Sequence, residues 1–102
     1  MAELKVVAVL VAKPGSEAVV HQAMHALVAP TRAEPGCLAY ELFESLAAPG
    51  TFLTVESWRE QADLEAHMQT GHVQQALAAA GDALAQPPGI HPLAPVSASD
   101  RA

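Results

Sequence analysis

The chain has 102 residues, of which 51% are hydrophobic and 16% charged, and its formal net charge is -6. This length predicts a single domain, and the acidic balance argues against a nucleic-acid partner, because no basic stripe is present to neutralise phosphates. The single cysteine, Cys37, excludes a disulfide within the chain and argues against a thiolate metal site. The apolar run at residues 6–12 is too short to cross a membrane and follows no basic leader, so we expect a cytoplasmic protein.

The first half of the chain predicts a strand, a helix and two more strands. Residues 4–12 are β-branched and apolar, which is typical of a strand buried on both faces. Apolar residues at helical spacing predict a helix over residues 17–29, which Pro30 should end or kink. Alternating patterns then predict strands over residues 37–45 and 51–58, with a turn between them.

The second half of the chain predicts two helices and a last strand. Residues 60–70 have a helical pattern whose apolar stripe includes His67, and a further helix follows Gly71. Residues 90–96 predict a strand that Pro92 confines to the edge of the sheet or to an irregular path, because proline cannot donate a ladder hydrogen bond.

The element order β-α-β-β-α-(α)-β is that of the split βαβ arrangement. It predicts an α+β, ferredoxin-like domain over residues 1–96, with a four-stranded antiparallel sheet and helices on one face, and a flexible C-terminal tail over residues 97–102. The strands carry apolar residues on both faces, so the uncovered face needs a partner. We therefore expect a homodimer that packs sheet on sheet, with a small-ligand pocket between sheet and helices in each subunit; a monomer with an apolar patch is the alternative.

Four residues near one end of the predicted sheet are candidates for chemistry. Glu56 and Trp58 are two residues apart on a strand, so their side chains share a face. His67 lies on the apolar stripe of the next helix, and His72 opens the helix after it. Imidazole and carboxylate groups move protons near neutral pH when burial tunes their pKa. The alternative is a core tryptophan beside histidines that bond backbone carbonyls.

The histidine spacing predicts no metal site. His67 and His72 are five residues apart, which on one helix places them roughly 140° from each other, a poor geometry for a shared ion. His21 and His25 share a helical face, but no third ligand accompanies them. No phosphate-binding loop or redox motif is present, so we expect no cofactor.

Three further polar residues have less specific readings. Tyr40, in the middle of a strand, either bonds a ligand through its hydroxyl or fills space in the core. Arg32 and Glu34 flank the turn before the second strand, where they predict a local ion pair of small energetic value.

Two stretches of the chain resemble the antibiotic biosynthesis monooxygenase family. These are residues 31–40 (TRAEPGCLAY) and residues 55–58 (VESW), the latter followed by His67 and His72. The resemblance covers nearly the whole chain and rests on the order and spacing of short motifs. It implies a dimeric α+β barrel and a cofactor-independent monooxygenase that oxidises a small quinol or polyketide-like aromatic with O₂.

The resemblance also implies roles for individual residues. His67 or His72 would be the base that deprotonates the substrate, and Glu56 would orient a histidine or hold a substrate hydroxyl. The expected substrate contacts are Trp58, Tyr40, Phe43 and Met68. Two other functions stay open: an isomerase of a small dicarbonyl, of the autoinducer-processing type, and a non-catalytic small-ligand-binding or stress protein that shares the fold.

Overall fold

Four strands form one antiparallel sheet in the order β2-β3-β1-β4. The computed structural model describes residues 3–96, so the predicted tail over residues 97–102 lies outside the described part. The central strand β1 pairs with β3 on one side and β4 on the other, and β2 pairs with β3. The strands are β1 (Leu4–Val11), β2 (Cys37–Glu44), β3 (Thr51–Trp58) and β4 (Gly89–Leu93).

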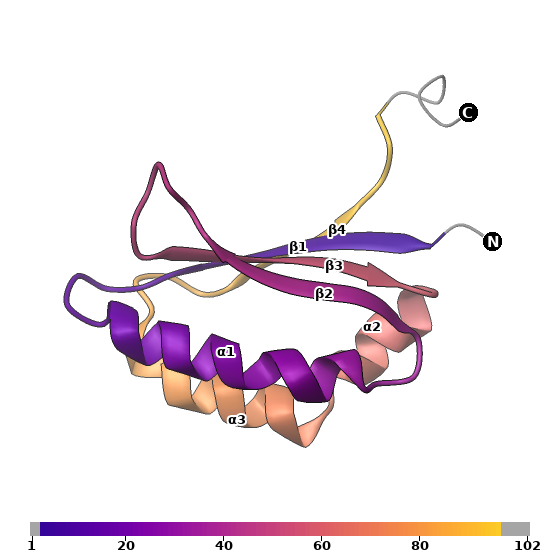
Figure 1. Cartoon of the computed structure of the whole chain (residues 1–102), viewed down its shortest axis with the longest axis horizontal. Coiled ribbons are helices and arrows are strands. Elements are labelled where there is room, and N and C mark those ends of the chain that lie inside the picture. The colour runs from indigo at the N-terminus through magenta and orange to yellow at the C-terminus, as the bar shows by residue number, and fades with distance from the viewer. Residues whose placement is uncertain (1–2, 97–102) are drawn as a thin grey trace.

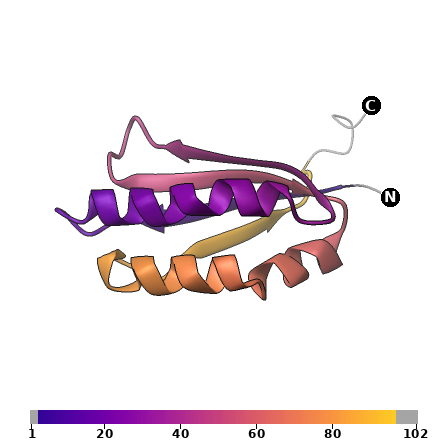
Figure 2. The same cartoon turned by 60° about the horizontal axis from the view of Figure 1, so that its bottom comes forward.

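The helices cover one face of this sheet (Figure 1). The helices α1 and α3 lie side by side along the sheet, and α2 lies at the end of the sheet where β3 ends (Figures 1 and 2). Their bounds are α1 (Glu17–Arg32), α2 (Gln61–Met68), α3 (Gly71–Ala80) and the short 3₁₀ helix η1 (Gly81–Ala83). This arrangement confirms the predicted α+β, ferredoxin-like fold. None of the helices within residues 3–96 has the length and hydrophobicity needed to cross a bilayer.

The prediction that Pro30 ends or kinks α1 near residue 29 is wrong in its boundary, because the helix continues to Arg32 with Pro30 inside it. Proline removes one backbone donor, and here it does so in the last turn, where little helix remains to be disrupted. Leu27 and Thr31, which lie on either side of Pro30, are both buried. Tertiary packing therefore holds the last turn in place. Pro92, by contrast, lies on β4 at the sheet edge, as predicted.

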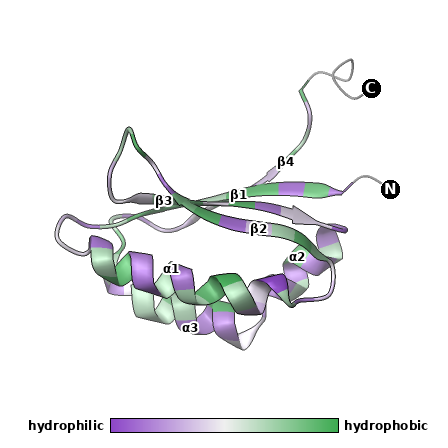
Figure 3. Cartoon of the chain, viewed as in Figure 1, coloured by the Kyte–Doolittle hydropathy of each residue, from purple (hydrophilic) through white to green (hydrophobic). Residues whose placement is uncertain are grey.

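The core lies between the sheet and the helices. Alternate residues of β1 and β3 point into it, among them Val6, Leu10 and Phe52, and α1 contributes Val20 and Leu27. The intervening residues point to the helix-free face, because side chains alternate along a strand. Most of β1 is hydrophobic (Figure 3). On that face the three valines of β1 are only partly buried, and Val55 of β3 is 42% exposed. The sheet therefore carries apolar side chains on both faces.

The buried hydroxyl of Thr31 offers a test of packing in the core. The Oγ1 atom of Thr31 is fully buried and has no hydrogen-bond partner among the described residues. An unpaired buried hydroxyl costs about 1–3 kcal/mol, and valine has nearly the same shape without it. We expect Thr31→Val to raise the free energy of unfolding in urea, whereas the control Thr31→Ala should lower it by leaving a cavity. Destabilisation by Thr31→Val would show that the hydroxyl is hydrogen-bonded in solution.

Candidate functional site

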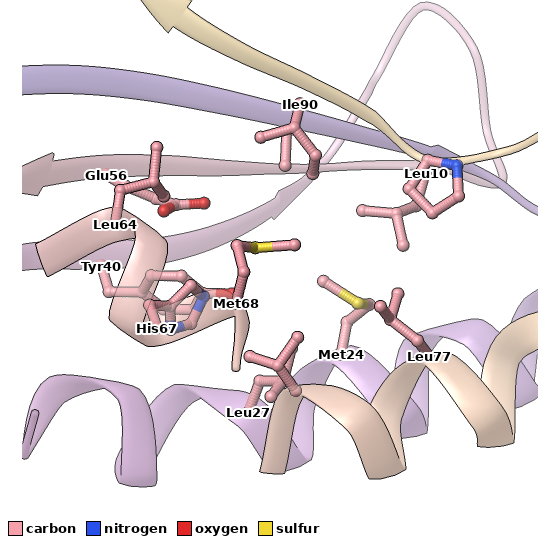
Figure 4. Close-up of a pocket in the computed structure, with 13 residues that line it drawn as sticks. Leu10, Met24, Leu27, Tyr40, Glu56, Leu64, His67, Met68, Leu77 and Ile90 are labelled. Carbon is pink, nitrogen blue, oxygen red and sulfur yellow. The ribbon is translucent and has the colours of Figure 1, made fainter. Parts of the chain in front are cut away.

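A cavity of about 40 Å³ lies between the sheet and the helices. Three polar side chains, Glu56, Tyr40 and His67, gather at one end of it, and Leu10, Met24 and Leu77 lie at the other (Figure 4). Every other residue that lines the cavity is apolar. A site of this kind offers a few convergent polar groups in a water-poor setting, which is the usual composition of a small-molecule site.

His67 is held by a carboxylate that does not itself line the cavity. Its Nδ1 atom lies 2.6 Å from Oε2 of Glu34, and both side chains are largely buried. An ionised carboxylate can only accept hydrogen bonds, so Nδ1 carries the hydrogen. In the neutral imidazole this leaves Nε2 unprotonated and free to accept a proton from a ligand in the cavity. This arrangement holds the ring with Nε2 available as a hydrogen-bond acceptor.

His72 contacts the same carboxylate oxygen as His67. Its Nε2 atom lies 2.7 Å from Oε2 of Glu34, but the side chain is 25% exposed and does not line the cavity. The one-helix geometry considered for His67 and His72 does not apply, because α2 ends at Met68 and α3 begins at Gly71. The chain turns between the two helices, so both imidazoles reach one acceptor.

Local hydrogen bonds fix the positions of these three side chains. The backbone of Glu34 is tied at both ends: its N–H donates to the carbonyl of Thr31, and its carbonyl accepts from the N–H of Cys37. Thr70 joins the two helices that carry the histidines. Its hydroxyl donates to the carbonyl of His67 and accepts from the N–H of Val73 at the start of α3.

Glu56 is buried at the polar end of the cavity, with 4% of its surface exposed. Its Oε1 atom accepts from Nε1 of Trp58 at 2.8 Å, and its Oε2 atom accepts from the hydroxyl of Thr54 at 2.5 Å. All three residues lie on β3 and point to the same side, since they are two residues apart. Each carboxylate oxygen keeps a second lone pair, so Glu56 can also accept from a ligand hydroxyl.

Two expected substrate contacts do not line the cavity. Trp58 is fully buried, and its ring stacks at a tilt on His67 with 4.8 Å between centroids. The indole donates to Glu56 and packs against His67, so it supports these two side chains and does not contact a ligand in the cavity. Phe43 is half-exposed and lines a separate groove beside α1, because its neighbours Tyr40 and Leu42 take the inward positions of β2. Tyr40 and Met68 do line the cavity.

The expected ion pair of Arg32 with Glu34 is wrong. Arg32 donates instead from Nε to the backbone carbonyl of Tyr40, while Glu34 faces the two histidines. The partner of the histidines is therefore Glu34, from the loop before β2, and not Glu56 of β3. Sequence reasoning missed this residue because the two contacts span 33 and 38 residues. Its place within the TRAEPGCLAY stretch was the only signal that pointed to it.

Tyr40 stays a hydrogen-bond donor over a wide pH range. Burial raises the pKa of its phenol, and the nearby Glu56 carboxylate raises that pKa further. The hydroxyl is therefore protonated at neutral pH and remains a hydrogen-bond donor there. Its ring centroid lies 5.8 Å from that of His67, so it forms a wall of the polar end of the cavity.

The raised pKa of Tyr40 predicts a fall of stability in alkali. The unfolded chain releases the phenolic proton near pH 10, whereas the folded protein retains it, so unfolding becomes more favourable above that pH by about 1.4 kcal/mol per pH unit. Tyr40 is the only tyrosine of the chain, so phenolate absorbance reports it alone. We expect phenolate to appear only together with loss of the circular dichroism signal. Tyr40→Phe should make the free energy of unfolding depend less on pH above about pH 10. Ionisation near pH 10 in the folded state would contradict this.

Comparisons with known proteins agree with the fold and extend the sequence resemblance. Residues 4–79 match the sequence profile of the family described as "Antibiotic biosynthesis monooxygenase". The chain is 32% identical over 91 residues to a Mycobacterium tuberculosis protein named "Putative monooxygenase Rv0793", and the match covers 89% of each chain. An uncharacterized Synechocystis protein, sll1783, is 36% identical over 63 residues, which are 62% of this chain and 43% of that protein.

Solved structures show the same architecture. The structure of Rv0793 from Mycobacterium tuberculosis superposes with a TM-score of 0.85 at 29% identity, covering 94% of this chain and 97% of that one. The crystal structure of PA3566 from Pseudomonas aeruginosa superposes with a TM-score of 0.84 at 34% identity, covering 95% and 97%.

Proposed function

Because this chain belongs to the antibiotic biosynthesis monooxygenase family, we propose that it is a monooxygenase that oxidises a small phenol or quinol with O₂, without a cofactor, using His67 as the base. The observation that carries the proposal is the 2.6 Å contact between Nδ1 of His67 and Glu34, on a ring that lines an apolar cavity. Of the two histidines expected from the sequence, only His67 lines that cavity.

The proposed reaction begins with proton transfer. The substrate hydroxyl binds at the polar end of the cavity, where Nε2 of His67 takes its proton and Glu34 stabilises the imidazolium that forms. A second substrate oxygen lies beside Glu56 or Tyr40. The apolar walls exclude water, which strengthens these interactions at the moment when charge develops.

The electrons come from the substrate alone. Conversion of a phenol to a quinone replaces a ring C–H and an O–H by two carbonyls and releases four electrons. O₂ takes up these four electrons as one oxygen atom enters the ring and the other leaves as water. The phenolate formed by His67 is the electron donor, and no other reductant is required.

The wall of the cavity must move for such a substrate to bind. A volume of about 40 Å³ is smaller than an aromatic ring needs. Met24 and Met68 project into the cavity (Figure 4). Methionine is unbranched and adapts to irregular shapes. We propose that these two side chains swing aside when the substrate enters.

Oxygen uptake tests the proposal. The purified protein, treated with chelator to remove metals, is incubated with a panel of quinols and hydroxylated aromatics in an oxygen electrode cell, with ¹⁸O₂ in a parallel reaction. We expect uptake above the spontaneous rate, one labelled oxygen in the product, and no hydrogen peroxide. Uptake no faster than the background with every compound would sink the monooxygenase proposal.

A second candidate is an isomerase of a small dicarbonyl. The observation in its favour is that His67 and Glu56 face the same end of one cavity, so two groups are placed to move a proton between neighbouring carbons. Solvent deuterium exchange into the dicarbonyl without oxygen uptake would identify this function. Saturable ligand binding without turnover of either kind would identify a binding protein.

We also propose that the chain acts as a homodimer through the helix-free face of the sheet. That face carries the partly buried valines of β1 and the exposed Val55, which a second sheet would bury. Val55→Glu should therefore shift the protein to a monomer in sedimentation experiments. The matched control is Val19→Glu on α1, where the valine is 49% exposed and away from the sheet; it should leave the dimer intact. A monomeric wild-type protein, or equal effects of both changes, would contradict the proposal.

A further inference from the structure

We propose that Glu34, His67 and His72 also form a binding site for a divalent transition-metal ion, with Zn²⁺ as the representative ion, and that bound metal switches off His67 as a base. The metal site stands on geometry alone. Its consequence for catalysis rests on the proposed function.

The donor atoms have the chemistry and the spacing of a zinc site. One ligand atom from each residue lies within 4.8 Å of the others: a carboxylate oxygen of Glu34 and one ring nitrogen from each histidine. Two histidines and one carboxylate, with water in the fourth position, form a recurrent zinc coordination set. Metal–ligand bonds of about 2.0–2.2 Å in a tetrahedron separate the ligand atoms by roughly 3.3 Å. The nitrogens lie 2.6 and 2.7 Å from Oε2 of Glu34, so each nitrogen–oxygen distance would widen by a fraction of an ångström. The two nitrogens lie within 4.8 Å of each other, so side-chain rotation alone would bring them to the tetrahedral spacing.

The three ligands are held by separate, ordered parts of the chain. Glu34 lies in a loop whose backbone is hydrogen-bonded on both sides, and Thr70 ties the end of α2 to the start of α3. Because the ligands are already ordered, metal binding at this site costs little conformational entropy. The side chain of His72 is 25% exposed, whereas that of Glu34 is only 10% exposed, so an ion enters past His72.

The charge of Glu34 favours a cation at this point. Within residues 3–96 no lysine or arginine forms an ion pair with Glu34, because the nearby Arg32 is bonded to a backbone carbonyl. A largely buried carboxylate that only imidazoles contact has no permanent positive partner. A divalent ion supplies one and binds both imidazoles at the same time.

Metal binding and base action exclude each other at His67. Without metal, Nδ1 of His67 donates to Glu34 and Nε2 is the free acceptor. A metal ion needs the lone pair of Nδ1, so the hydrogen of the neutral ring must move to Nε2. The ring then presents a donor to the cavity and cannot take a proton from a substrate. The same rearrangement at His72 moves its hydrogen from Nε2 to Nδ1.

The test is a Zn²⁺ titration of the full chain after chelator treatment, in competition with a chromophoric chelator, with Co²⁺ as a visible probe of coordination. We expect one tight equivalent per chain and a tetrahedral Co²⁺ spectrum. Loss of a direct ligand in Glu34→Gln or His72→Ala should weaken binding by roughly 100-fold or more, beyond the effect of removing an outer-shell partner. Both variants are checked for unchanged thermal unfolding; Glu34→Gln keeps the shape of the side chain.

The matched control is His25→Ala. His25 and His21 stack on the exposed side of α1 with 6.1 Å between ring centroids, so this change removes a histidine from a different pair. It should leave the tight equivalent unchanged. Absence of a tight equivalent, or its loss with His25→Ala, would overturn the metal site. Tight binding at these residues in a protein without oxygenase activity would support the metal site but contradict the proposed function. Full oxygenase activity of the zinc-loaded protein would show that bound metal does not switch off His67.

Discussion

Replacing His67 with glutamine is expected to lower kcat for oxygen uptake by about 10²–10⁴-fold, the usual contribution of a positioned general base. Glutamine can still donate to Glu34 from its amide, so the loop before β2 should stay in place. KM should change much less than kcat, because the cavity walls are untouched. The measurement is steady-state oxygen uptake by wild type and variant, with thermal unfolding as the check of folding.

Two further variants make this result specific. His25→Gln removes an imidazole from the exposed side of α1 and should leave kcat unchanged. His72→Gln loosens one of the two contacts of Glu34 while leaving His67 in the cavity, so it should lower kcat less than His67→Gln does. If His67→Gln retains wild-type kcat, or if His72→Gln is the more damaging change, His67 is not the base.

Replacing Trp58 with phenylalanine is expected to lower the free energy of unfolding by about 2–3 kcal/mol, because it leaves a buried charged acceptor without its donor. The Nε1 atom of Trp58 donates to Oε1 of Glu56 at 2.8 Å, and both residues are buried. A loss of this size is a large share of the stability of a small domain. The measurement is urea unfolding followed by circular dichroism, since Trp58 is the only tryptophan and its fluorescence is lost with it.

A double-mutant cycle separates this hydrogen bond from simple packing. Glu56→Gln removes the charge, and the hydroxyl of Thr54 can still donate to the amide oxygen. In that background Trp58→Phe should cost less by about 1–3 kcal/mol, the coupling expected for residues in direct contact. An equal cost in both backgrounds would show that Trp58 contributes by packing alone and does not support the carboxylate.

The strands were the most predictable part of the fold. The third predicted strand, residues 51–58, coincides with β3, since strict alternation of Phe52, Thr54, Glu56 and Trp58 toward the core leaves one register open. Helix boundaries were harder to predict. Pro30 is a local stop signal, yet packing of Leu27 and Thr31 carries α1 to Arg32, and such packing depends on residues far away in the sequence.

The candidate site was predictable in its residue types but not in its pairings. Spacing on β3 correctly placed Glu56 and Trp58 on one face, and helical periodicity correctly turned His67 inward. Neither pattern could show that Glu34 reaches His67 and His72, because that contact depends on how the loop before β2 packs beside the turn between α2 and α3. Strand alternation alone also could not show that the Trp58 indole donates to Glu56 and that Trp58 does not line the cavity.

The protonation pattern of the His67 ring is the decisive observation, because His67 can act as the base only if Glu34 holds the ring with Nε2 free. Long-range ¹H–¹⁵N correlation spectra of the metal-free protein distinguish the two ring nitrogens, and a His67→Gln sample assigns the signals. We expect His67 to carry its hydrogen on Nδ1 when neutral, and Glu34→Ala to remove this preference. A hydrogen on Nε2 in the metal-free protein would rule out His67 as the base, since the ring would then present a donor to the cavity.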